Sequence, residues 1–371
     1  MRILHVSDCY APRTGGIESQ VRDLARQQVV AGHEVHVMTA TATADGQHGV
    51  VQDDGGVQVH RLGTRLPFEL PINPAAPPRM RALMRDLQPD VVHVHAGVVS
   101  PFAYDGARVA LGEALPLAIT WHCMLDGAVA ALRGAVGASR WRSAPVALSA
   151  VSRAAADRVE AVFRQPAAVL PNGLDLDLWA PSEATASPTL RCVATMRLAP
   201  RKRGLALIGV VEDALAQLED GELKLDIIGD GPMRGRIEKR IARRGLGGIT
   251  LRGRLDRAQI RDIYAQADVF VAPAVLEAFG IAALEARAAG LAVVARRGTG
   301  IEEFITGGVD GLLVDDDAGM ARAFVRLAKD AALAAALTGH ARAHRPVHGW
   351  RKTLDAAESE YRRARLMRAP N

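Results

Sequence analysis

The chain has 371 residues, of which 49% are hydrophobic and only 4% aromatic, and its formal net charge is +5. This length exceeds what one ordinary core organises, so two α/β domains packed through Ala, Val and Leu are expected. The charge fits a polyanionic ligand or an acidic membrane surface. A nucleic-acid partner is not expected, because the basic residues are interspersed with acids and form no stripe with interleaved aromatics.

Cysteine use and hydropathy indicate the cellular compartment of the protein. Cys9, Cys123 and Cys192 are odd in number, far apart and in no metal-ligand spacing, so reduced thiols in a cytoplasm are expected. Met1 leads almost directly into a strand without a signal peptide, and no run of 18 or more uncharged apolar residues occurs. We therefore expect a cytoplasmic protein, either free or at the inner face of the membrane.

Apolar runs of strand length alternate with amphipathic helical patterns in the first half of the chain. Residues 2–7 predict a buried first strand, and Ile17, Val21 and Leu24 mark the helix after it. Further strands are expected at residues 35–39, 57–61, 90–95, 117–121, 146–151 and 168–170. The stretch 64–78 is rich in Pro and has no period, so a surface loop is expected there.

The pattern breaks at residues 172–188, where Pro181 and Pro188 with neighbouring serines indicate an interdomain linker. Strands of a second series are expected at residues 190–196, 224–229, 249–252, 268–272, 291–295 and 311–314. The charged stretch 351–365 predicts a final helix. The expected fold is two tandem Rossmann-like, doubly wound domains, with ligand sites at the carboxyl ends of the strands facing one another across a cleft.

The stretch 275–290, between two apolar runs, predicts a loop and a helix before the next strand. A helix beginning near Gly280 has unpaired first amides and the positive end of the macrodipole, so the loop before it can hold a diphosphate. Glu277 precedes this helix and Glu285 lies inside it. Two carboxylates beside an anion site can accept hydrogen bonds from the diols of a nucleoside diphosphate sugar. Two solvated acids at a helix start are the alternative.

Four cations follow the first strand of the second series: Arg197, Arg201, Lys202 and Arg203. Beyond the carboxyl end of a strand such a cluster can clamp a diphosphate, although a solvated basic turn fits the same pattern. The sequence therefore offers cations as well as helix amides to an anionic ligand.

Glycines occur in two loops that follow strands. Gly15 and Gly16 lie between the first strand and its helix, where glycine lets the backbone approach a phosphate. The alternative is a plain turn. The spacing of these glycines is not that of the dinucleotide-binding fingerprint. Gly229 opens a Gly-Asp-Gly-Pro turn, a type that is mostly structural. Arg254 and Leu255 occupy the loop before a helix expected from residue 256.

His122 differs from the other histidines by its position at the carboxyl end of a predicted strand, within Thr120-Trp121-His122. A lone histidine is usually structural, and the remaining candidates are expected to be so: His5, His60, His93 and His95. Residues 128–142, after His122, are apolar and basic. They either contact a lipid acceptor or a bilayer surface or pack as a core helix.

In order from Gly15 to Glu285, these motifs resemble those of retaining glycosyltransferases of the GT-B fold, in particular sequence family four. The resembling strings are T-G-G-I-E, T-W-H, P-N-G-L-D, R-L-A-P-R-K-R-G, G-D-G-P, G-R-L and E-A-F-G-I-A-A-L-E. Two departures occur: Arg203 intervenes between Lys202 and Gly204, and Thr299 and Glu302 replace the usual Gly and Pro of a later turn. For that reason Glu303 is given no chemical role.

The resemblance implies a role for each matching residue. Arg197 and Lys202 neutralise the diphosphate leaving group, Glu277 and His122 meet the transferred sugar, and Glu285 meets the ribose. Further donor contacts are implied at Gly15, Gly16, Gly229, Arg254, Leu255, Phe279 and Gly280.

The resemblance also implies an acceptor-binding domain at residues 1–172, a donor-binding domain at 189–345 and a C-terminal helix, 346–371, that crosses back to the first domain. The implied activity is that of a metal-independent, retaining hexosyltransferase without a cofactor. The donor is GDP-mannose or a UDP-sugar, and the acceptor is a hydroxyl of a glycan, glycolipid or small molecule. A non-catalytic two-domain protein that closes on its ligand is the alternative.

Overall fold

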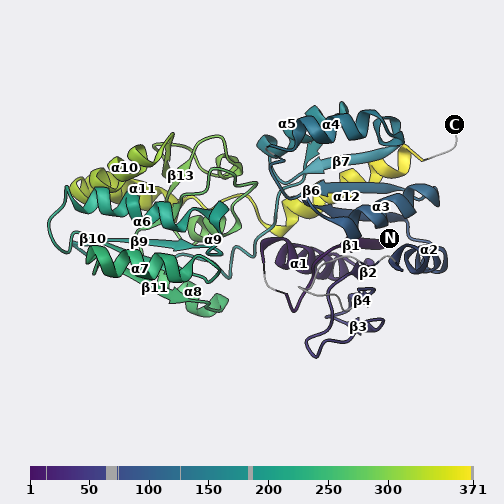
Figure 1. The fold of residues 1–371 in the computed structure, drawn as a ribbon, viewed down its shortest axis with the longest axis horizontal. Helices are drawn as coiled ribbons and strands as arrows, with labels where there is room; N and C mark the ends of the chain where they lie inside the picture. Colours follow the sequence, from purple (N-terminus) through teal and green to yellow (C-terminus); the bar gives the residue numbers. More distant parts are fainter. Residues whose placement is uncertain (14, 64–72, 74, 126, 183–186, 369–371) are drawn as a thin grey trace. The chain divides into compact units, whose positions relative to one another are not determined.

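The computed structural model describes residues 1–13, 15–63, 73, 75–125, 127–182 and 187–368 (Figure 1). The chain divides into two compact units. Unit 1 comprises Met1–Gly173 together with Trp350–Asn371, and unit 2 comprises Leu174–Gly349.

Unit 1 is built on a sheet with the strand order β3-β4-β2-β1-β5-β6-β7-β8, parallel except for the pair β3 and β4. The strands are β1 (Arg2–Ser7), β2 (Glu34–Thr39), β3 (Val51–Asp53), β4 (Gln58–Arg61), β5 (Val91–Ala96), β6 (Leu117–Trp121), β7 (Val146–Ala150) and β8 (Ala167–Val169). The helices are α1 (Gly16–Val30), α2 (Ala76–Leu87), α3 (Pro101–Gly112), α4 (Val129–Gly137), α5 (Arg153–Phe163) and α12 (Trp350–Leu366), with a 3-10 turn, η2 (Arg140–Ser143).

The central strands of unit 1 are buried along their whole length, which explains their nearly continuous apolar sequence. Alternation along β5 sends Val92 and Val94 to one face and His93 and His95 to the other. The parallel register pairs His5 of β1 with His93 of β5. Histidines of neighbouring strands are therefore brought to one buried face of the sheet.

Helix α12, at the end of the chain, packs on the sheet of unit 1. Its buried residues Ala357, Tyr361 and Ala364 lie against apolar residues of four strands and the loop after β8, namely Ile3, Val91, Ala118, Ala147 and Leu170. Figure 1 shows this helix in yellow along β6 and β7. The helix expected at residues 351–365 is thus present with nearly the same bounds.

Unit 2 has the strand order β11-β10-β9-β12-β13-β14, and its described pairs are all parallel. The strands are β9 (Leu190–Thr195), β10 (Leu223–Ile228), β11 (Ile249–Gly253), β12 (Val269–Ala272), β13 (Ala292–Arg296) and β14 (Gly311–Val314). The helices are α6 (Gly204–Leu215), α7 (Arg234–Arg244), α8 (Arg257–Tyr264), α9 (Ile281–Ala288), α10 (Asp317–Lys329) and α11 (Ala331–Ala343), with 3-10 turns η3 (Pro200–Lys202) and η4 (Gly300–Glu303). The predicted class, two doubly wound α/β domains in tandem, is confirmed.

Two details differ from the sequence prediction. Strand β3 was not predicted, because it is short, exposed along its length and pairs only at the edge of the sheet, so it carries no apolar signal. Residues 174–180 were placed in a linker, but the Trp179 ring is buried and packs 5.6 Å from the Tyr264 ring, which joins this segment to unit 2. Most of the loop predicted at 64–78 lies outside the described residues, and α2 begins at its end.

Candidate active site

The strand order of unit 2 reverses direction between β9 and β12, which are neighbours in the sheet but far apart in sequence. In open α/β sheets, ligands bind at the carboxyl ends of the strands at such a switch point. The loop that follows β9 contains Arg197 and Lys202, and the loop that follows β12 contains Glu277. The fold therefore brings two separate sequence motifs to one edge of this unit.

Lys202 and Glu277 form an ion pair across these two loops. The Nζ atom of Lys202 lies 2.5 Å from Oε2 of Glu277, and the two side chains are 24% and 19% exposed. The pair is thus partly shielded but accessible to a ligand. Contact between these two side chains, 75 positions apart, was not predicted.

Helix α9 begins immediately after Gly280, as predicted, and Glu285 lies in its second turn. Gly280 has φ 88° and ψ 58°, and a Cβ there would lie 2.6 Å from Cγ1 of Ile301, so glycine is required on both counts. No side chain caps this N-terminus. Its amides, together with the Lys202 ammonium, therefore offer a positive environment beside Glu277.

Glu285 lies on the same side of unit 2 as Tyr264, whose pKa is well above its ordinary value because of burial and the charge of Glu285. The Tyr264 hydroxyl donates to Oγ1 of Thr195, at the end of β9, over 2.9 Å. Glu285 is half-buried. Its carboxylate is thus held near the carboxyl end of β9.

The other predicted cations differ in their surroundings. Arg197 and Arg201 are exposed. Arg203 pairs with Asp317 over 2.5 Å and directly precedes α6, with φ 60°. Arg203 thus fastens the loop to α10.

Gly229 and Gly231 have a packing reason for being glycine. A Cβ on Gly229 would lie 1.9 Å from the Met196 carbonyl oxygen, and one on Gly231 would lie 2.6 Å from that of Leu198. Backbone hydrogen bonds join the two segments, from Leu198 N to Asp230 O over 2.9 Å and from Met233 N to Leu198 O over 2.9 Å. The turn therefore holds the basic loop in place by close backbone contact.

The remaining residues of unit 2 that are predicted to contact the sugar donor differ in their exposure to solvent. Arg254 is exposed and Leu255 half-buried, after the end of β11. The Phe279 ring is 2% exposed and packs 5.4 Å from the Phe304 ring and 5.8 Å from the His348 ring. Its side chain therefore belongs to the interior of unit 2.

In unit 1, α1 begins at Gly16, next to the extended Gly15. A Cβ on Gly15 would lie 2.2 Å from Oε2 of Glu18, whose side chain folds back over the start of the helix. Thr14, the first residue of the predicted loop, lies outside the described residues. The predicted glycines are thus at a helix N-terminus, where a phosphate could reach backbone amides.

His122 follows the carboxyl end of β6, and its backbone N–H donates to the Ala96 carbonyl over 2.9 Å. Its ring is half-buried, and burial lowers its pKa from 6.5 to about 4. Its Nε2 lies 3.0 Å from Nδ1 of His95. The ring is thus neutral at physiological pH and held from one side by a second histidine.

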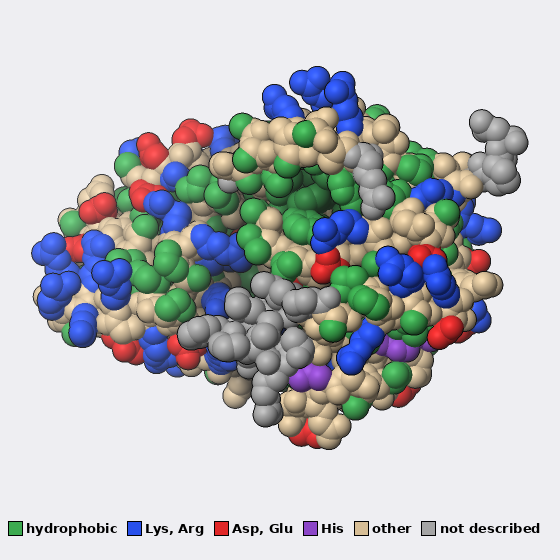
Figure 2. Space-filling model, turned by 45° about the vertical axis from the view of Figure 1, so that its right-hand side comes forward, with side chains coloured by type: hydrophobic (Ala, Val, Ile, Leu, Met, Phe, Trp, Pro, Cys, Tyr) green, Lys and Arg blue, Asp and Glu red, His purple; other side chains and the backbone are tan. Residues whose placement is uncertain are grey.

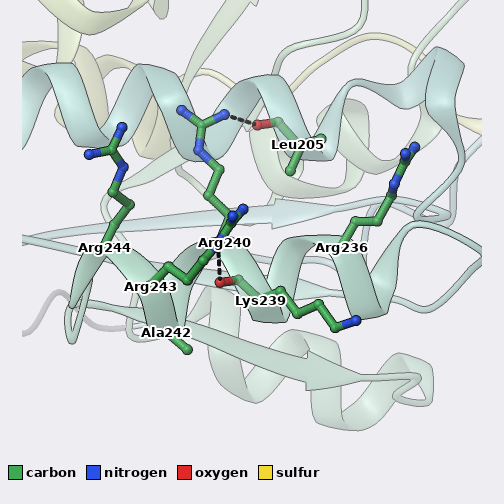
Figure 3. A pocket seen from close by; sticks show the side chains of 7 residues that line it. All are labelled: Leu205, Arg236, Lys239, Arg240, Ala242, Arg243 and Arg244. Atoms are coloured by element: carbon green, nitrogen blue, oxygen red, sulfur yellow. Dashed lines mark hydrogen bonds between the residues drawn. The ribbon is translucent and has the colours of Figure 1, made fainter.

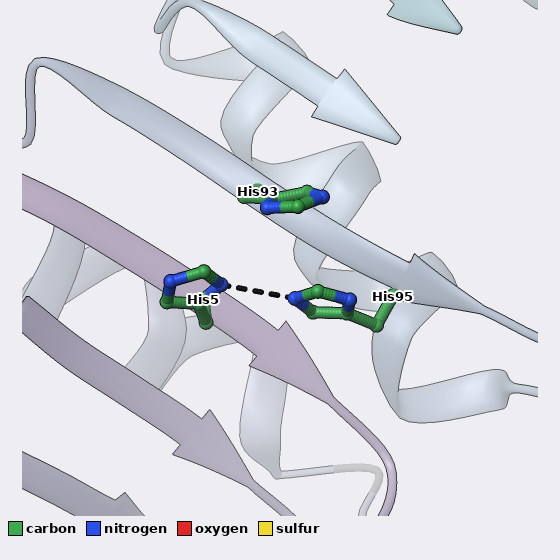
Figure 4. Close-up of side chains that lie close together, drawn as sticks. All are labelled: His5, His93 and His95. Carbon is green, nitrogen blue, oxygen red and sulfur yellow. Dashed lines mark hydrogen bonds between the residues drawn. The ribbon is translucent and has the colours of Figure 1, made fainter. Parts of the chain in front are cut away.

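Three buried histidines of unit 1, His5, His93 and His95, present ring nitrogens within 4.8 Å of one another (Figure 4). These nitrogens are engaged in hydrogen bonds, between His5 Nδ1 and His95 Nε2 over 2.9 Å and between His93 Nε2 and Thr120 Oγ1 over 2.7 Å. Asp175, which with Asp177 resembles a metal-binding D-x-D, instead accepts hydrogen bonds from the backbone N–H groups of residues 177 and 178, and Asp177 pairs with Arg345 over 3.0 Å.

A cavity of about 1050 Å³ lies along α7 and the start of α6 (Figure 3). It is lined by Leu205, Arg236, Lys239, Arg240, Ala242, Arg243 and Arg244. Arg240 and Arg244 both pair with Glu212 over 3.0 Å. In Figure 2 basic side chains gather at the left end and at the top of the visible face, and acidic side chains lie around the left group.

Comparisons with known proteins define the family of this chain. Residues 14–178 match the family described as Glycosyltransferase Family 4, and residues 187–330 match Glycosyl transferases group 1. A GDP-mannose-dependent alpha-mannosyltransferase of Mycolicibacterium smegmatis is 27% identical over 339 residues, with 85% of each chain covered. A GDP-mannose-dependent alpha-(1-6)-phosphatidylinositol dimannoside mannosyltransferase of Mycobacterium tuberculosis is 28% identical over 325 residues, with 82% of each covered.

The fold is also similar to the crystal structure of Anabaena Alr3699/HepE in complex with UDP and glucose, with a TM-score of 0.73, 20% identity and coverage of 96% of this chain and 98% of that one. Two α/β units, each built on a mainly parallel sheet with these motifs at its strand ends, define a glycosyltransferase of the GT-B fold that uses a nucleotide sugar. The chain belongs to glycosyltransferase family four, a family of retaining hexosyltransferases.

Proposed function

We propose that this enzyme transfers mannose from GDP-mannose to a hydroxyl of an inositol-containing lipid, with unit 2 binding the donor and unit 1 binding the acceptor. The relatives quoted above support the donor and the acceptor class, because their names state GDP-mannose and, in one case, a phosphatidylinositol dimannoside. The single observation that carries the catalytic proposal is the Lys202–Glu277 ion pair at the switch point of unit 2.

The pair suggests an exchange of partners when the donor binds. Glu277 neutralises Lys202 at 2.5 Å. A diphosphate carries more negative charge than one carboxylate, so it competes for the Lys202 ammonium when the donor binds. Glu277 is then free to accept hydrogen bonds from hydroxyls of the transferred sugar. Arg197, exposed in the same loop, adds a second cation for the diphosphate.

Glu285 is proposed to accept hydrogen bonds from the ribose diol, because its carboxylate lies one helical turn deeper than the start of α9. Amides at that start, and those near Gly15 and Gly16, are proposed to contact phosphate oxygens. Gly229, Arg254 and Leu255 complete the proposed donor contacts. At Phe279 the buried ring leaves only the backbone for such a contact.

The proposed reaction is attack by the acceptor hydroxyl on the same face from which the diphosphate departs, with a phosphate oxygen accepting the proton of that hydroxyl. Fixed cations and helix amides stabilise the leaving group, so a metal ion is not required. The carboxylate that follows β1 in unit 1, Asp8, is 7% exposed and accepts from the Phe102 N–H at the start of α3 over 3.1 Å. Asp8 thus caps a helix, and we give it no role as a nucleophile. His122 is proposed to hold a hydroxyl of the transferred sugar.

A lipid acceptor also fits the surface of α4. Within this helix only Val136 is buried, so of the two interpretations of residues 128–142 the core helix is wrong and the surface one is supported. Arg133 and Arg142, which are exposed, would face anionic headgroups. None of the described helices is long and apolar enough to cross a membrane. We therefore propose peripheral contact with an anionic bilayer.

The experiment that tests this function is a calorimetric titration of the purified protein with GDP-, UDP- and ADP-sugars, followed by a transfer assay with phosphatidylinositol vesicles. We expect GDP-mannose to bind most tightly and mannose to be transferred to the lipid. Preference for a UDP-sugar would contradict the donor assignment. Transfer to a water-soluble glycan, with none to the lipid, would contradict the acceptor assignment.

A further inference from the structure

His122 lies at one end of a continuous buried chain of hydrogen bonds in unit 1. Nε2 of His122 lies 3.0 Å from Nδ1 of His95, Nε2 of His95 lies 2.9 Å from Nδ1 of His5, and Nε2 of His5 lies 2.7 Å from Oε1 of Gln28. Gln28, on α1, is 1% exposed, and His5 and His95 are 0% and 3% exposed. Four side chains from α1, β1, β5 and the end of β6 are therefore connected in one row.

A second arm leaves the other end of the same Gln28 amide. Its Nε2 donates to the Tyr361 hydroxyl over 2.8 Å, and this hydroxyl lies 2.9 Å from Nδ1 of His93. His93 Nε2 contacts Thr120 Oγ1 over 2.7 Å, Thr120 contacts Ser149 Oγ over 2.8 Å, and the Ser149 hydroxyl donates to the Ile119 carbonyl over 3.3 Å. The described residues thus form two arms that meet at one amide.

The histidines of both arms are neutral at physiological pH, because burial lowers the pKa of His5 and His122 to about 4 and those of His93 and His95 well below 6.5. A neutral imidazole donates from one ring nitrogen and accepts at the other. Each ring in the row therefore fixes the tautomer of the next. The Gln28 amide has an oxygen that accepts and a nitrogen that donates. Its orientation therefore decides in which direction all the hydrogen bonds of the row donate.

The amide oxygen of Gln28 accepts, so His5 must carry its proton on Nε2 and accept at Nδ1. His95 must then donate from Nε2 and accept at Nδ1, and His122 must donate from Nε2. The second arm agrees with this direction. With Gln28 donating to Tyr361, every hydroxyl has one acceptor, ending with the Ser149 proton on the Ile119 carbonyl. The opposite direction turns the Ser149 proton toward Thr120 and leaves that carbonyl contact without a hydrogen.

We infer that Gln28 is a positioning residue that holds His122 in its Nε2–H tautomer, so that Nδ1 of His122 is a bare acceptor for a hydroxyl of the transferred sugar. This inference rests on the sugar contact proposed for His122. Within the described residues, Nδ1 of His122 has no hydrogen-bond partner, and the ring is half-exposed. In the other tautomer Nδ1 would carry a proton and could not accept from the hydroxyl.

The test measures the tautomer directly. Long-range ¹⁵N–¹H NMR of histidine-labelled full-length protein distinguishes a protonated ring nitrogen from a bare one, and the His122→Ala spectrum identifies the His122 signals. We expect a bare Nδ1 and a protonated Nε2 for His122 in the wild type. A protonated Nδ1 overturns the inference. Ring shifts that change when the protein is treated with a chelator overturn it too, because His5, His93 and His95 would then bind a metal.

Three variants separate positioning from stability. Gln28→Met removes the acceptor of His5, so His122 should show both tautomers and kcat should fall roughly three- to tenfold with unchanged nucleotide affinity. In Gln28→Glu a carboxyl oxygen can still accept from His5, so the tautomer and kcat should be close to wild type. Gln20→Met is the matched control: Gln20 is another buried glutamine of α1, it hydrogen-bonds to Gly173 outside this network, and its replacement should leave both unchanged.

The possible failures can be told apart. If Gln20→Met lowers kcat as much as Gln28→Met does, the loss comes from the stability of α1 and the inference is wrong. If Gln28→Met leaves the His122 shifts at their wild-type values, Gln28 does not set the tautomer. Wild-type turnover in His122→Ala overturns the proposed sugar contact, whereas a protonated Nδ1 in an enzyme that needs His122 overturns only the inference about Gln28.

Discussion

Replacing Lys202 with Ala should weaken binding of the nucleoside diphosphate, and replacing its partner Glu277 with Gln should not. Glu277 neutralises Lys202 at 2.5 Å, with the Lys202 side chain 24% exposed and that of Glu277 19% exposed. A pair of this exposure is worth at most about 1 kcal/mol. A charge-assisted contact between the lysine and a diphosphate is worth roughly 1.5–3 kcal/mol.

These magnitudes set the expected affinities. Lys202→Ala should raise Kd for the nucleoside diphosphate roughly ten- to 150-fold, because it loses the charge-assisted contact. Glu277→Gln removes the competing carboxylate, so Kd should stay equal or fall up to about fivefold. Because Glu277 meets the sugar in the proposed complex, this variant should nevertheless turn over more slowly.

Isothermal titration with GDP checks both values, and Arg201→Ala is the matched control, since Arg201 is an exposed cation of the same loop without an assigned role. Its Kd should stay within about twofold of wild type. In the double variant Lys202→Ala/Glu277→Gln, affinity should match that of Lys202→Ala. If Glu277→Gln weakens GDP binding as much as Lys202→Ala does, the exchange of partners at Lys202 is refuted.

Three further predictions concern the same site. Glu285→Gln should weaken GDP binding roughly three- to tenfold, because a ribose contact is lost. Glu302→Gln, at an exposed position, should leave GDP binding unchanged. Equal GDP affinity in Glu285→Gln and wild type, measured by titration, would remove Glu285 from the site. Turnover should survive excess EDTA, because fixed cations and amides stabilise the diphosphate; loss of activity that Mg²⁺ or Mn²⁺ restores would contradict this. His122→Ala should lower kcat by roughly two orders of magnitude with GDP affinity near wild type, and a parallel loss of GDP affinity would place His122 at the nucleotide instead.

Much of this fold could be predicted from the sequence because its strands are buried on both faces. Runs such as Val91–Ala96 and Leu117–Trp121 are mostly apolar and contain no Gly, Pro or acidic residue, so their existence and approximate bounds follow from the sequence pattern. Edge strand β3 has no such signal, since its three residues are exposed. Trp179 was assigned to a linker because neighbouring prolines dominate the local pattern, whereas its burial against Tyr264 depends on tertiary packing.

The strand ends at which the candidate site residues lie could be predicted, but the contacts between these residues could not. The motifs placed Lys202 and Glu277 at strand ends, yet their ion pair depends on the adjacency of β9 and β12, which hydrophobic patterns do not specify. His5 and His95 were expected to be only structural, and the sequence gives no register that would align them with His122. One signal was present: Gln28 falls on the buried face of α1, in helical step with Val21, Leu24 and Ala25, where a polar residue needs a partner.

The configuration of the product tests the central claim most directly. Wild-type enzyme is supplied with the nucleotide sugar that binds most tightly and with the phosphatidylinositol acceptor, and the glycosidic linkage formed is read by NMR from the coupling at the anomeric carbon, with intact-protein mass spectrometry run in parallel. We predict the same anomeric configuration in product and donor, and no glycosyl adduct on the protein. A product of inverted configuration, or a covalent glycosyl-enzyme, would contradict same-face transfer at this site.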